Sequence, residues 1–503
     1  MNLVYNASAG TGKTYQVTQL YEKLVLEDGI DPRNILLMTF TRNAAAELRM
    51  RVAHRLLKAR RLAESENDDA LADRAITAMS HLLSAPISTI DAFCTRLLRE
   101  HALEVGLSPG FSVLEEDDRK ELLDQICRDE LLVRLTSDPD FKAFCSGAHI
   151  IGNGKGFGTS ITETAPNLIS QAGSLGISLE NAEAMLPEPA PNTTRIDFEM
   201  ICKRIKELPR ITPAVQTALD ILELSLKETN DVESLAMRMG ELGIKKFGRG
   251  AKEISDDFWQ LKESVEDAIR YREHYPAAKA FARYVQSVHL NFQRRKHTMD
   301  AVDFADLSHM AVKLLKSGKA TPGFEYVLID EVQDISRIQY QLIQSLWEKE
   351  TNLVICGDRK QGIYTWRDAD PQVMPDLEKE ILATNGALAT VSHVPRQRGH
   401  VKNLQTSYRS KTPIIDVVNK LFAAVYGEEE YSATETLKVN DAFKTEDEKP
   451  CIEFLSFNGE EECPKQDKIA AEMEAVANRI QLLAGGEAGW SPSYRYSDGF
   501  EPT

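Results

Sequence analysis

The sequence predicts an α/β protein with a parallel sheet whose strands are separated by one long helical segment. Residues 1–60 alternate short apolar strands with helical patterns, and two further apolar strands follow much later, at 326–329 and 353–356. Between about 94 and 294, helical patterns replace strand patterns. Apolar runs that are continuous, with no polar alternation, are typical of parallel strands covered on both faces.

The opening of the chain predicts the order strand, loop, helix, strand, helix. Leu3–Tyr5 is a short apolar strand, and Ile35–Phe40 is a nearly continuous apolar run followed by a helix from about Ala44 to Arg60. The helical stripe between the two strands consists of Val17, Leu20, Tyr21 and Leu24. This alternation is typical of a doubly wound α/β domain.

Three more elements are expected after residue 400. A helix is predicted at Ile414–Val425, and a strand at Cys451–Phe457 after an acidic stretch. A last amphipathic helix is indicated by Ile469, Met473, Val476, Ile480 and Leu483, which repeat at helical spacing.

The composition is that of a globular protein with an acidic balance. The 503 residues are 42% hydrophobic and 27% charged, which excludes a collagenous or largely disordered chain. The net charge of −17 argues against a uniformly basic surface, but residues 421–503 hold 18 acidic and 7 basic residues, so a basic channel is still compatible with the earlier part. Neither a membrane span nor a signal peptide is expected. Seven scattered cysteines without a CxxC pair indicate reduced thiols in a cytosolic protein.

A phosphate-binding loop is the strongest motif. It matches GxxxxGK[ST], with alanine at the first glycine position, over Ala7, Ser8, Ala9, Gly10, Thr11, Gly12, Lys13 and Thr14. Small residues let successive backbone N–H groups surround a phosphate at the start of a helix. Lys13 would reach the β and γ phosphates of ATP, and the Thr14 hydroxyl would bind Mg²⁺. The alternative is a chance glycine turn between a strand and a helix.

Two carboxylates follow the apolar strand Val327–Ile329. Asp330 would hold Mg²⁺ through water, and Glu331 would polarise the attacking water as a general base. An Asp-Glu pair is also common on protein surfaces. Its place after a strand, in a chain that carries Lys13, favours the catalytic interpretation.

A glutamine and an aromatic cluster follow the strand at 353–356. Gln361 would sense the γ-phosphate. Tyr364, Trp366 and Arg367 form an aromatic and cationic group suited to stacking on unpaired bases. Ordinary core packing is the alternative for the aromatic residues.

Two other segments favour a structural interpretation. Gly152–Gly158 looks like a nucleotide loop but follows no strand, so we expect a flexible loop. The basic run Arg294–His297 is expected to be a solvated helix face, with a DNA contact as the alternative.

Together these motifs resemble superfamily 1 DNA helicases of the UvrD/Rep type, and most closely the RecB/AddA-like branch that processes double-strand breaks. The blocks that carry the resemblance stand in the family's order and are Ala7–Thr14, Thr39–Glu47, Ser88–Cys94, Asp303–Leu307, Asp330–Asp334, Gly357–Arg367 and Leu404–Arg409. The resemblance implies a RecA-like P-loop NTPase core. In that core Tyr408 would stack on adenine and Arg409 would contact the γ-phosphate.

The resemblance also implies a path for single-stranded DNA. Phe40, Tyr364 and Trp366 would stack on its bases, and Thr41 and Arg367 would help to hold it. The implied activity is that of an ATP-dependent 3′-to-5′ DNA helicase, or helicase–nuclease subunit, in repair and recombination.

The chain departs from the family's pattern at several places. Arg42 stands where asparagine is usual, Asp91 where histidine is frequent, and Ser407 where asparagine precedes the tyrosine. A glutamine that reads adenine in many relatives would lie upstream of Met1. The family's later motifs, with a second arginine finger, are also missing, so the chain looks like the N-terminal half of a helicase that hydrolyses ATP poorly on its own.

The expected organisation is a first RecA-like core at 1–94 and 295–395, a helical insertion at 95–294 and a partial second core at 396–503. The expected cofactors are ATP and Mg²⁺. The expected partners are DNA and either a nuclease, a second helicase subunit or a downstream polypeptide that completes the second core. Two alternatives stay open: a nucleotide-regulated DNA-binding module, and a truncated remnant that no longer translocates.

Overall fold

The computed structural model divides into two compact units. One unit combines Met1–Pro109 with Leu307–Thr503, and the other is Gly110–Asp306. The residues that the structure describes are 2–147, 161–188, 195–208, 211, 213–228, 234, 252–365, 368–383, 399–430, 436–444 and 465–484.

A six-stranded parallel sheet organises the first unit, which confirms the predicted α/β class. Its strands lie in the order β3-β2-β6-β7-β1-β8. Their bounds are β1 (Asn2–Ala7), β2 (Ile35–Thr39), β3 (Ile87–Thr89), β6 (Tyr326–Ile329), β7 (Asn352–Gly357) and β8 (Gly399–Leu404). Because all strands are parallel, their carboxyl ends lie at one edge, where loops from distant parts of the sequence meet.

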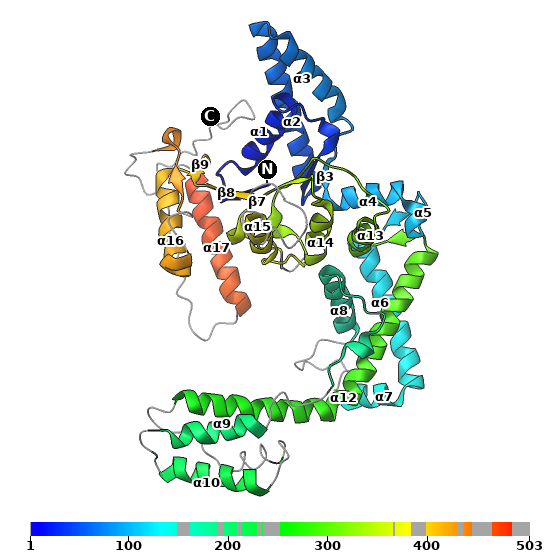
Figure 1. Cartoon of the computed structure of the whole chain (residues 1–503), viewed down its shortest axis with the longest axis vertical. Helices are drawn as coiled ribbons and strands as arrows, with labels where there is room; N and C mark the ends of the chain where they lie inside the picture. The colour runs from blue at the N-terminus through cyan, green and yellow to red at the C-terminus, as the bar shows by residue number, and fades with distance from the viewer. Residues whose placement is uncertain are drawn as a thin grey trace. The chain divides into compact units, whose positions relative to one another are not determined.

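Helices cover both faces of this sheet (Figure 1). One face carries α1 (Lys13–Leu26), α2 (Arg42–Glu66) and α3 (Asp69–Leu82). The other carries α13 (Phe304–Lys316), α14 (Arg337–Leu346) and α15 (Val373–Ala383). Helices α4 (Ile90–Glu100) and α5 (Ala102–Val105) follow β3.

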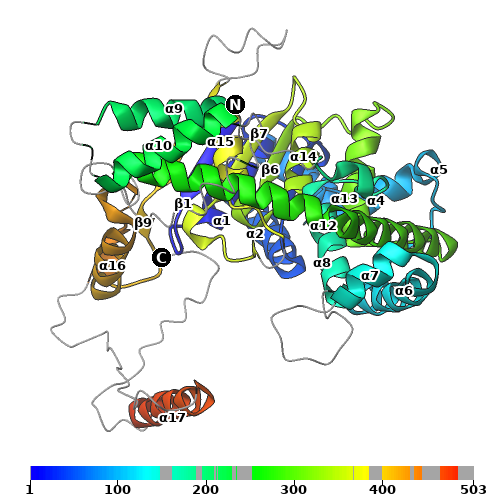
Figure 2. The ribbon, with the colours of Figure 1, turned by 90° about the horizontal axis from the view of Figure 1, so that it is seen from below.

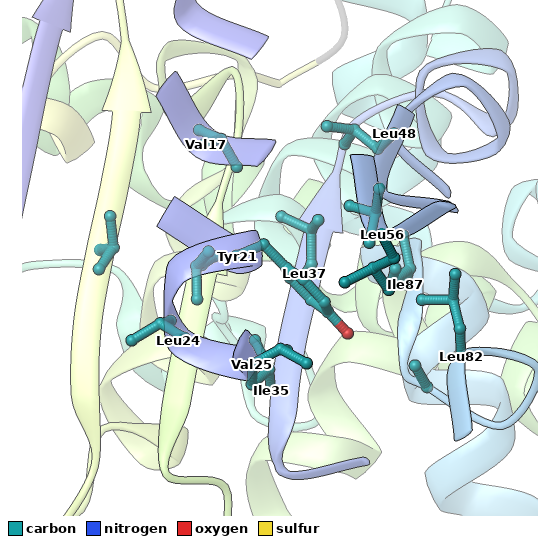
Figure 3. Close-up of a cluster of buried hydrophobic side chains, with 14 of the residues drawn as sticks. Val17, Tyr21, Leu24, Val25, Ile35, Leu37, Leu48, Leu56, Leu82 and Ile87 are labelled. Atoms are coloured by element: carbon teal, nitrogen blue, oxygen red, sulfur yellow. The ribbon is translucent and has the colours of Figure 1, made fainter. Parts of the chain in front are cut away.

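The core beneath α1 explains why this helix holds a fixed place on the sheet. Side chains of α1 at helical spacing meet Ile35 and Leu37 of β2 and the apolar face of α2 (Figure 3). Tyr21 is fully buried there, and its hydroxyl donates a 3.4 Å hydrogen bond to the carbonyl oxygen of Pro32. Burial of each large apolar side chain contributes about 1.5–3 kcal/mol. The loop between β1 and α1 is therefore anchored at both ends.

The second unit is helical, with one short strand pair. It contains β4 (Ser112–Val113), α6 (Glu116–Ser137), α7 (Pro139–Gly147), α8 (Ile161–Leu175), α9 (Arg195–Lys206), α10 (Pro213–Glu228), α12 (Lys252–Thr298) and β5 (Ala301–Val302). The long helix α12 packs against α6, α7 and α8, which gather beside it in Figure 2. Their shared core includes Tyr284, Phe141 and Phe292. Tyr284 also donates a 2.9 Å hydrogen bond to the carbonyl oxygen of Cys127.

A buried ionic cluster at the end of α12 corrects one prediction. Arg294, Arg295 and His297 are exposed, as expected of a solvated face, but Lys296 is only 2% exposed. Its ammonium group binds Asp306 and donates a 2.9 Å hydrogen bond to Asp303. The four-residue run is therefore not uniformly solvated, because the helical turn directs Lys296 inward.

The two aspartates of this cluster also cap α13. The Asp303 carboxylate accepts the backbone N–H of Asp306 at 2.9 Å, and the Asp306 carboxylate accepts that of Asp303 at 3.0 Å. Burial opposes ionisation of Asp303, but Lys296 and the backbone hydrogen bond hold its pKa below the usual value. The cluster therefore joins the end of α12 to the start of α13.

The remaining described α-helices and strands of the first unit follow β8. They are β9 (Thr406–Ser407), α16 (Thr412–Glu430, with non-helical geometry at Gly427), β10 (Lys438–Val439) and α17 (Lys465–Ala484). β9 and β10 pair in parallel. Among the described helices, none is both long and apolar enough to cross a membrane.

The structure places several boundaries differently from the sequence-based expectation. The units divide at Pro109 and Asp306, whereas the insertion was expected at 95–294. β8 pairs with β1, so residues assigned to the second core include a strand of the first. The strands β3, β4, β5, β8, β9 and β10 were not predicted. The expected strand Cys451–Phe457 and loop Gly152–Gly158 lie outside the described residues.

We expect Lys296→Ala to destabilise the second unit by about 3–5 kcal/mol, because it leaves Asp306 without its buried cation and Asp303 with Arg119 as its remaining ion-pair partner. Urea unfolding, with limited proteolysis of residues 110–306 as the probe, would measure this loss of stability. Arg294→Ala, on the exposed side of the same run, is the matched control and should change stability by less than about 0.5 kcal/mol. Equal unfolding midpoints for the two variants would contradict the structural role of Lys296.

Candidate functional site

The loop between β1 and α1 has the backbone geometry of a phosphate cradle. Gly10 and Gly12 have φ values of 76° and 83°, a region that side chains disfavour. The Thr11 hydroxyl donates a 2.7 Å hydrogen bond to the carbonyl oxygen of Ser8, which closes the turn. Ala7 is the last residue of β1 and is not among the positive-φ residues of the described chain, so alanine fits where the motif usually has glycine.

Lys13 forms an ion pair across the sheet edge with Glu331. Its ammonium nitrogen lies 2.7 Å from Glu331 Oε2, and its side chain is only 9% exposed. Burial lowers the pKa of Lys13, but Glu331 outweighs this effect and raises it above the usual value. Glu331 has a φ of 54°, in the left-handed region, which aims its side chain at the loop. The predicted lysine and general base therefore meet in the fold.

The carboxylates beside this pair fit a divalent cation. Burial, reinforced by Glu331, raises the pKa values of Asp330 and Asp334 to about 6. Asp334 Oδ1 is buried without a hydrogen-bond partner. Three carboxylates thus face one ammonium group, an imbalance that Mg²⁺ would neutralise.

The predicted magnesium ligands suit an ion that also binds phosphate. No group of three or more His, Cys, Asp or Glu side chains in the described part of the chain forms a complete metal cage. Mg²⁺ usually takes one or two protein oxygens together with substrate phosphates and water. Asp330 after β6 and Thr14 in the first turn of α1 suit that arrangement.

A series of hydrogen bonds connects Glu331 with Gln361. Gln333 donates from Nε2 to Glu331 Oε2 at 2.8 Å, and its Oε1 accepts the backbone N–H of Asp358 at 3.0 Å. Asp358 Oδ2 then accepts Gln361 Nε2 at 2.7 Å. A Cβ at Gly357 would lie 2.7 Å from Gln333 Oε1, so only glycine leaves room for this side chain. The predicted γ-phosphate sensor is thus linked to the predicted base.

The segment after β8 approaches the phosphate loop. The backbone N–H of Tyr408 donates a 2.8 Å hydrogen bond to the carbonyl oxygen of Gly10. A Cβ at Gly10 would lie 2.7 Å from Arg409 Cβ, and one at Gly12 would lie 3.9 Å from the Tyr408 ring. Buried Ser407 accepts the backbone N–H groups of Arg409 and Ser410 at 3.4 Å, so serine performs a structural role at this departure from the family pattern.

Two of the predicted base-stacking residues lie together. The rings of Phe40 and Tyr364 are 5.4 Å apart at an interplanar angle of 33°, and both side chains are half-buried. Thr41 is exposed, and its hydroxyl accepts the backbone N–H of Ala44 at the start of α2. Trp366 and Arg367 lie outside the described residues.

Two departures from the family pattern are electrostatic neighbours. β2 and β3 are adjacent, with Thr39 opposite Thr89, so α2 and α4 begin at the same sheet edge. Burial raises the pKa of Asp91 in α4 to about 6, and Arg42 in α2 opposes this rise. Arginine and aspartate therefore balance each other beside the predicted DNA path.

A family comparison agrees with this geometry. The model of the UvrD/REP helicase N-terminal domain matches residues 1–381, most of the chain. The chain belongs to the UvrD/REP helicase family. This confirms the resemblance inferred from the motifs, including its RecB/AddA-like character, because the similar curated proteins are helicase/nuclease subunits.

Three relatives illustrate the similarity, and each is named as an ATP-dependent helicase/nuclease subunit. The protein of Geobacillus kaustophilus is 26% identical over 96% of this chain and 43% of its own length. The protein of Alkaliphilus oremlandii is 26% identical over 97% of this chain and 44% of its own length. The protein of Syntrophomonas wolfei is 25% identical over 85% of this chain and 37% of its own length. The chain thus spans less than half the length of these relatives.

Sequence reasoning missed two buried polar residues of this site. Gln333 is 4% exposed and Asp358 is 2% exposed, and both stand inside motifs whose other residues received roles. Each follows an apolar strand at the same edge of a parallel sheet. This placement could have indicated that both residues belong to the site. Their mutual hydrogen bond, however, joins the Gln333 side chain to the backbone N–H of Asp358, and a sequence motif does not specify such a contact.

We expect Lys13→Ala to abolish nucleotide binding or turnover, because the phosphates then lose their main cationic partner. Titration with a fluorescent ATP analogue and steady-state phosphate release would measure it. Lys58→Ala, in α2 and away from the loop, is a control for the loss of one lysine. ATP affinity and turnover at the wild-type level in Lys13→Ala would refute the phosphate-loop assignment.

We expect Asp91→Asn to stabilise the protein at neutral pH by about 2 kcal/mol. The folded state binds a proton at Asp91 more tightly than the unfolded state does, because the pKa of Asp91 is raised to about 6. Ionised Asp91 therefore lowers the free energy of unfolding increasingly as pH rises from about 4 to about 6, and by its full amount at higher pH. The advantage of the variant should therefore fade on acidification. Chemical denaturation from pH 4.5 to 8, with exposed Asp73→Asn as control, would test this, and a pH-independent difference would count against it.

Proposed function

We propose that this chain is the N-terminal part of an ATP-dependent DNA helicase, or helicase–nuclease subunit, that moves 3′ to 5′ on single-stranded DNA in repair and recombination. The observation that carries the proposal is one continuous sheet edge. It holds the Lys13–Glu331 pair after β1 and β6 and the Phe40–Tyr364 rings after β2 and β7. The proposed nucleotide site and the proposed base-stacking surface would thus share one sheet.

In the proposed nucleotide site, each side chain has a distinct task. Ala7–Thr14 would surround the phosphates, and Lys13 would move from Glu331 to their charge. Mg²⁺, held by Thr14 and Asp330, would neutralise the phosphate oxygens when bound. Glu331, released from Lys13, would accept the proton of the attacking water.

The remaining groups would bind the two ends of ATP. Gln361 and Arg409 would contact the γ-phosphate, and Tyr408 would stack on the adenine. The hydrogen bond between Tyr408 and Gly10 supports this assignment, since it holds residues 408–409 against the loop. ATP hydrolysis would then drive movement along DNA.

Single-stranded DNA would lie along the same edge. Half-buried Phe40 and Tyr364 leave ring surface for bases, and Thr41 lies exposed beside them. Trp366 and Arg367 would extend this path, as inferred from their motif. Such contacts with chromosomal DNA favour a cytoplasmic location.

The C-terminal helices support a protein partner. Apolar side chains of α16 and α17 are exposed, among them Leu421, Val425, Met473 and Ile480 at 55%, 66%, 69% and 60%. Exposed apolar stripes of this kind mark protein contacts. We infer that further polypeptide completes the second RecA-like core here, and that a nuclease or second helicase subunit joins the assembly.

We expect Phe40→Ala or Tyr364→Ala to weaken binding of single-stranded DNA about ten-fold or more, because stacking contributes roughly 1–3 kcal/mol per base. Fluorescence anisotropy with a labelled oligothymidine at matched salt would measure it. Tyr275→Ala in α12 is the control for loss of one aromatic ring. Unchanged DNA affinity in both site variants would indicate that these rings serve only core packing. DNA binding without DNA-stimulated ATP turnover would favour the alternative function, a nucleotide-regulated DNA-binding module.

A further inference from the structure

Two buried side chains with no role in the chemistry join the nucleotide site to the stacking rings. Gln333 touches Glu331 with one end of its amide and the backbone of Asp358 with the other. Asp358 binds the side chain of Gln361 and also accepts the backbone N–H of Lys360 at 3.0 Å. We call these links the Gln333–Asp358 relay.

The relay starts at an atom whose environment must change when a nucleotide binds. Glu331 Oε2 accepts hydrogen bonds from both Lys13 and Gln333. Phosphate competes for Lys13, so Glu331 loses one of its two partners when the loop is filled. The position of the Gln333 amide depends on the same carboxylate oxygen.

The relay ends in a short, internally bonded segment that carries Tyr364. Within it, the backbone N–H of Gln361 donates to the carbonyl oxygen of Asp358 at 2.9 Å, and that of Ile363 to Gln361 at 2.8 Å. Tyr364 follows directly and packs on Phe40. A shift of Asp358 would therefore be passed on to the ring pair.

The space around Gln333 leaves little freedom to absorb such a shift elsewhere. Gln333 is 4% exposed, and its oxygen lies where a side chain at position 357 would clash. Its Nε2 is also 3.4 Å from Asp334 Oδ2. The Gln333 amide is thus held by Glu331, Asp334 and Asp358. A displacement of the Glu331 carboxylate would therefore move the amide and, with it, the backbone of Asp358.

We propose that Gln333 is a positioning residue that couples nucleotide occupancy to the grip on single-stranded DNA, with Asp358 as the second member of the relay. The proposal rests on the proposed function, because it assumes that the loop binds nucleotide and the rings bind DNA. It assigns Gln333 no contact with ATP or with DNA. Coupling between two ligands is reciprocal, so it is measurable from DNA affinity alone.

The test measures how a non-hydrolysable ATP analogue with Mg²⁺ changes the affinity for labelled oligothymidine. In the wild-type chain we expect the bound analogue to change the dissociation constant for DNA by about 5- to 150-fold, the usual range for coupled sites. Gln333→Met keeps the length of the side chain but removes its hydrogen bonds to Glu331, Asp334 and the backbone of Asp358. In this variant the change should fall to about two-fold or less, while DNA affinity without nucleotide and analogue affinity without DNA stay near the wild-type values.

Two further variants separate coupling from general damage. Asp358→Ala removes both acceptor oxygens that bind Gln361 and Lys360. It should lose coupling as Gln333→Met does, and the double variant should lose no more, because both residues act in one relay. Gln344→Ala, an exposed glutamine of α14, should keep wild-type coupling. Thermal unfolding and circular dichroism of each variant would verify that it folds.

The outcomes distinguish this proposal from the proposed function. Wild-type coupling retained in folded Gln333→Met would overturn the relay and leave the helicase assignment intact. DNA binding that no nucleotide alters in the wild-type chain would overturn it as well. Absence of DNA binding in the wild-type chain would instead contradict the proposed function. If Gln333→Met does not fold, Asp358→Ala decides between these outcomes.

Discussion

The ion pair between Lys13 and Glu331 is the contact on which the rest of the site depends. Three carboxylates, Asp330, Glu331 and Asp334, stand near one buried ammonium group, and burial raises the pKa values of the two aspartates. Without Lys13 this edge would hold uncompensated negative charge, a costly state in a protein interior. Glu331 has a left-handed backbone conformation, and the oxygen that binds Lys13 also accepts the hydrogen bond of Gln333.

Most of the fold and part of the site followed from local sequence patterns. β1, β2, β6 and β7 are continuous apolar runs, and the glycines of the loop give their own conformational signal. Strand β3 escaped prediction because it has only three residues, and β8 because polar residues interrupt its apolar ones. Lys296 escaped because its burial depends on Asp303 and Asp306, which lie beyond the end of its helix.

The family resemblance supplied what periodicity could not. Tyr408 and Arg409 stand in no pattern that points to a nucleotide, yet the structure brings their segment against Gly10 and Gly12. The departures were informative in a different way. Ser407 keeps its turn by accepting two backbone N–H groups, and Arg42 and Asp91 are neighbours that compensate each other's charge. To recognise such compensation from the sequence, one must know which strands are adjacent in the sheet.

The pairing of β8 with β1 matters for anyone who divides this protein into fragments. The family match ends at residue 381, but the sheet ends only at Leu404. A fragment cut after 381 would leave β1, a fully formed inner strand, as an open edge with unpaired N–H and C=O groups. Open edges of this kind recruit other chains and promote aggregation. The natural place to separate the first core from the C-terminal elements therefore lies beyond β8.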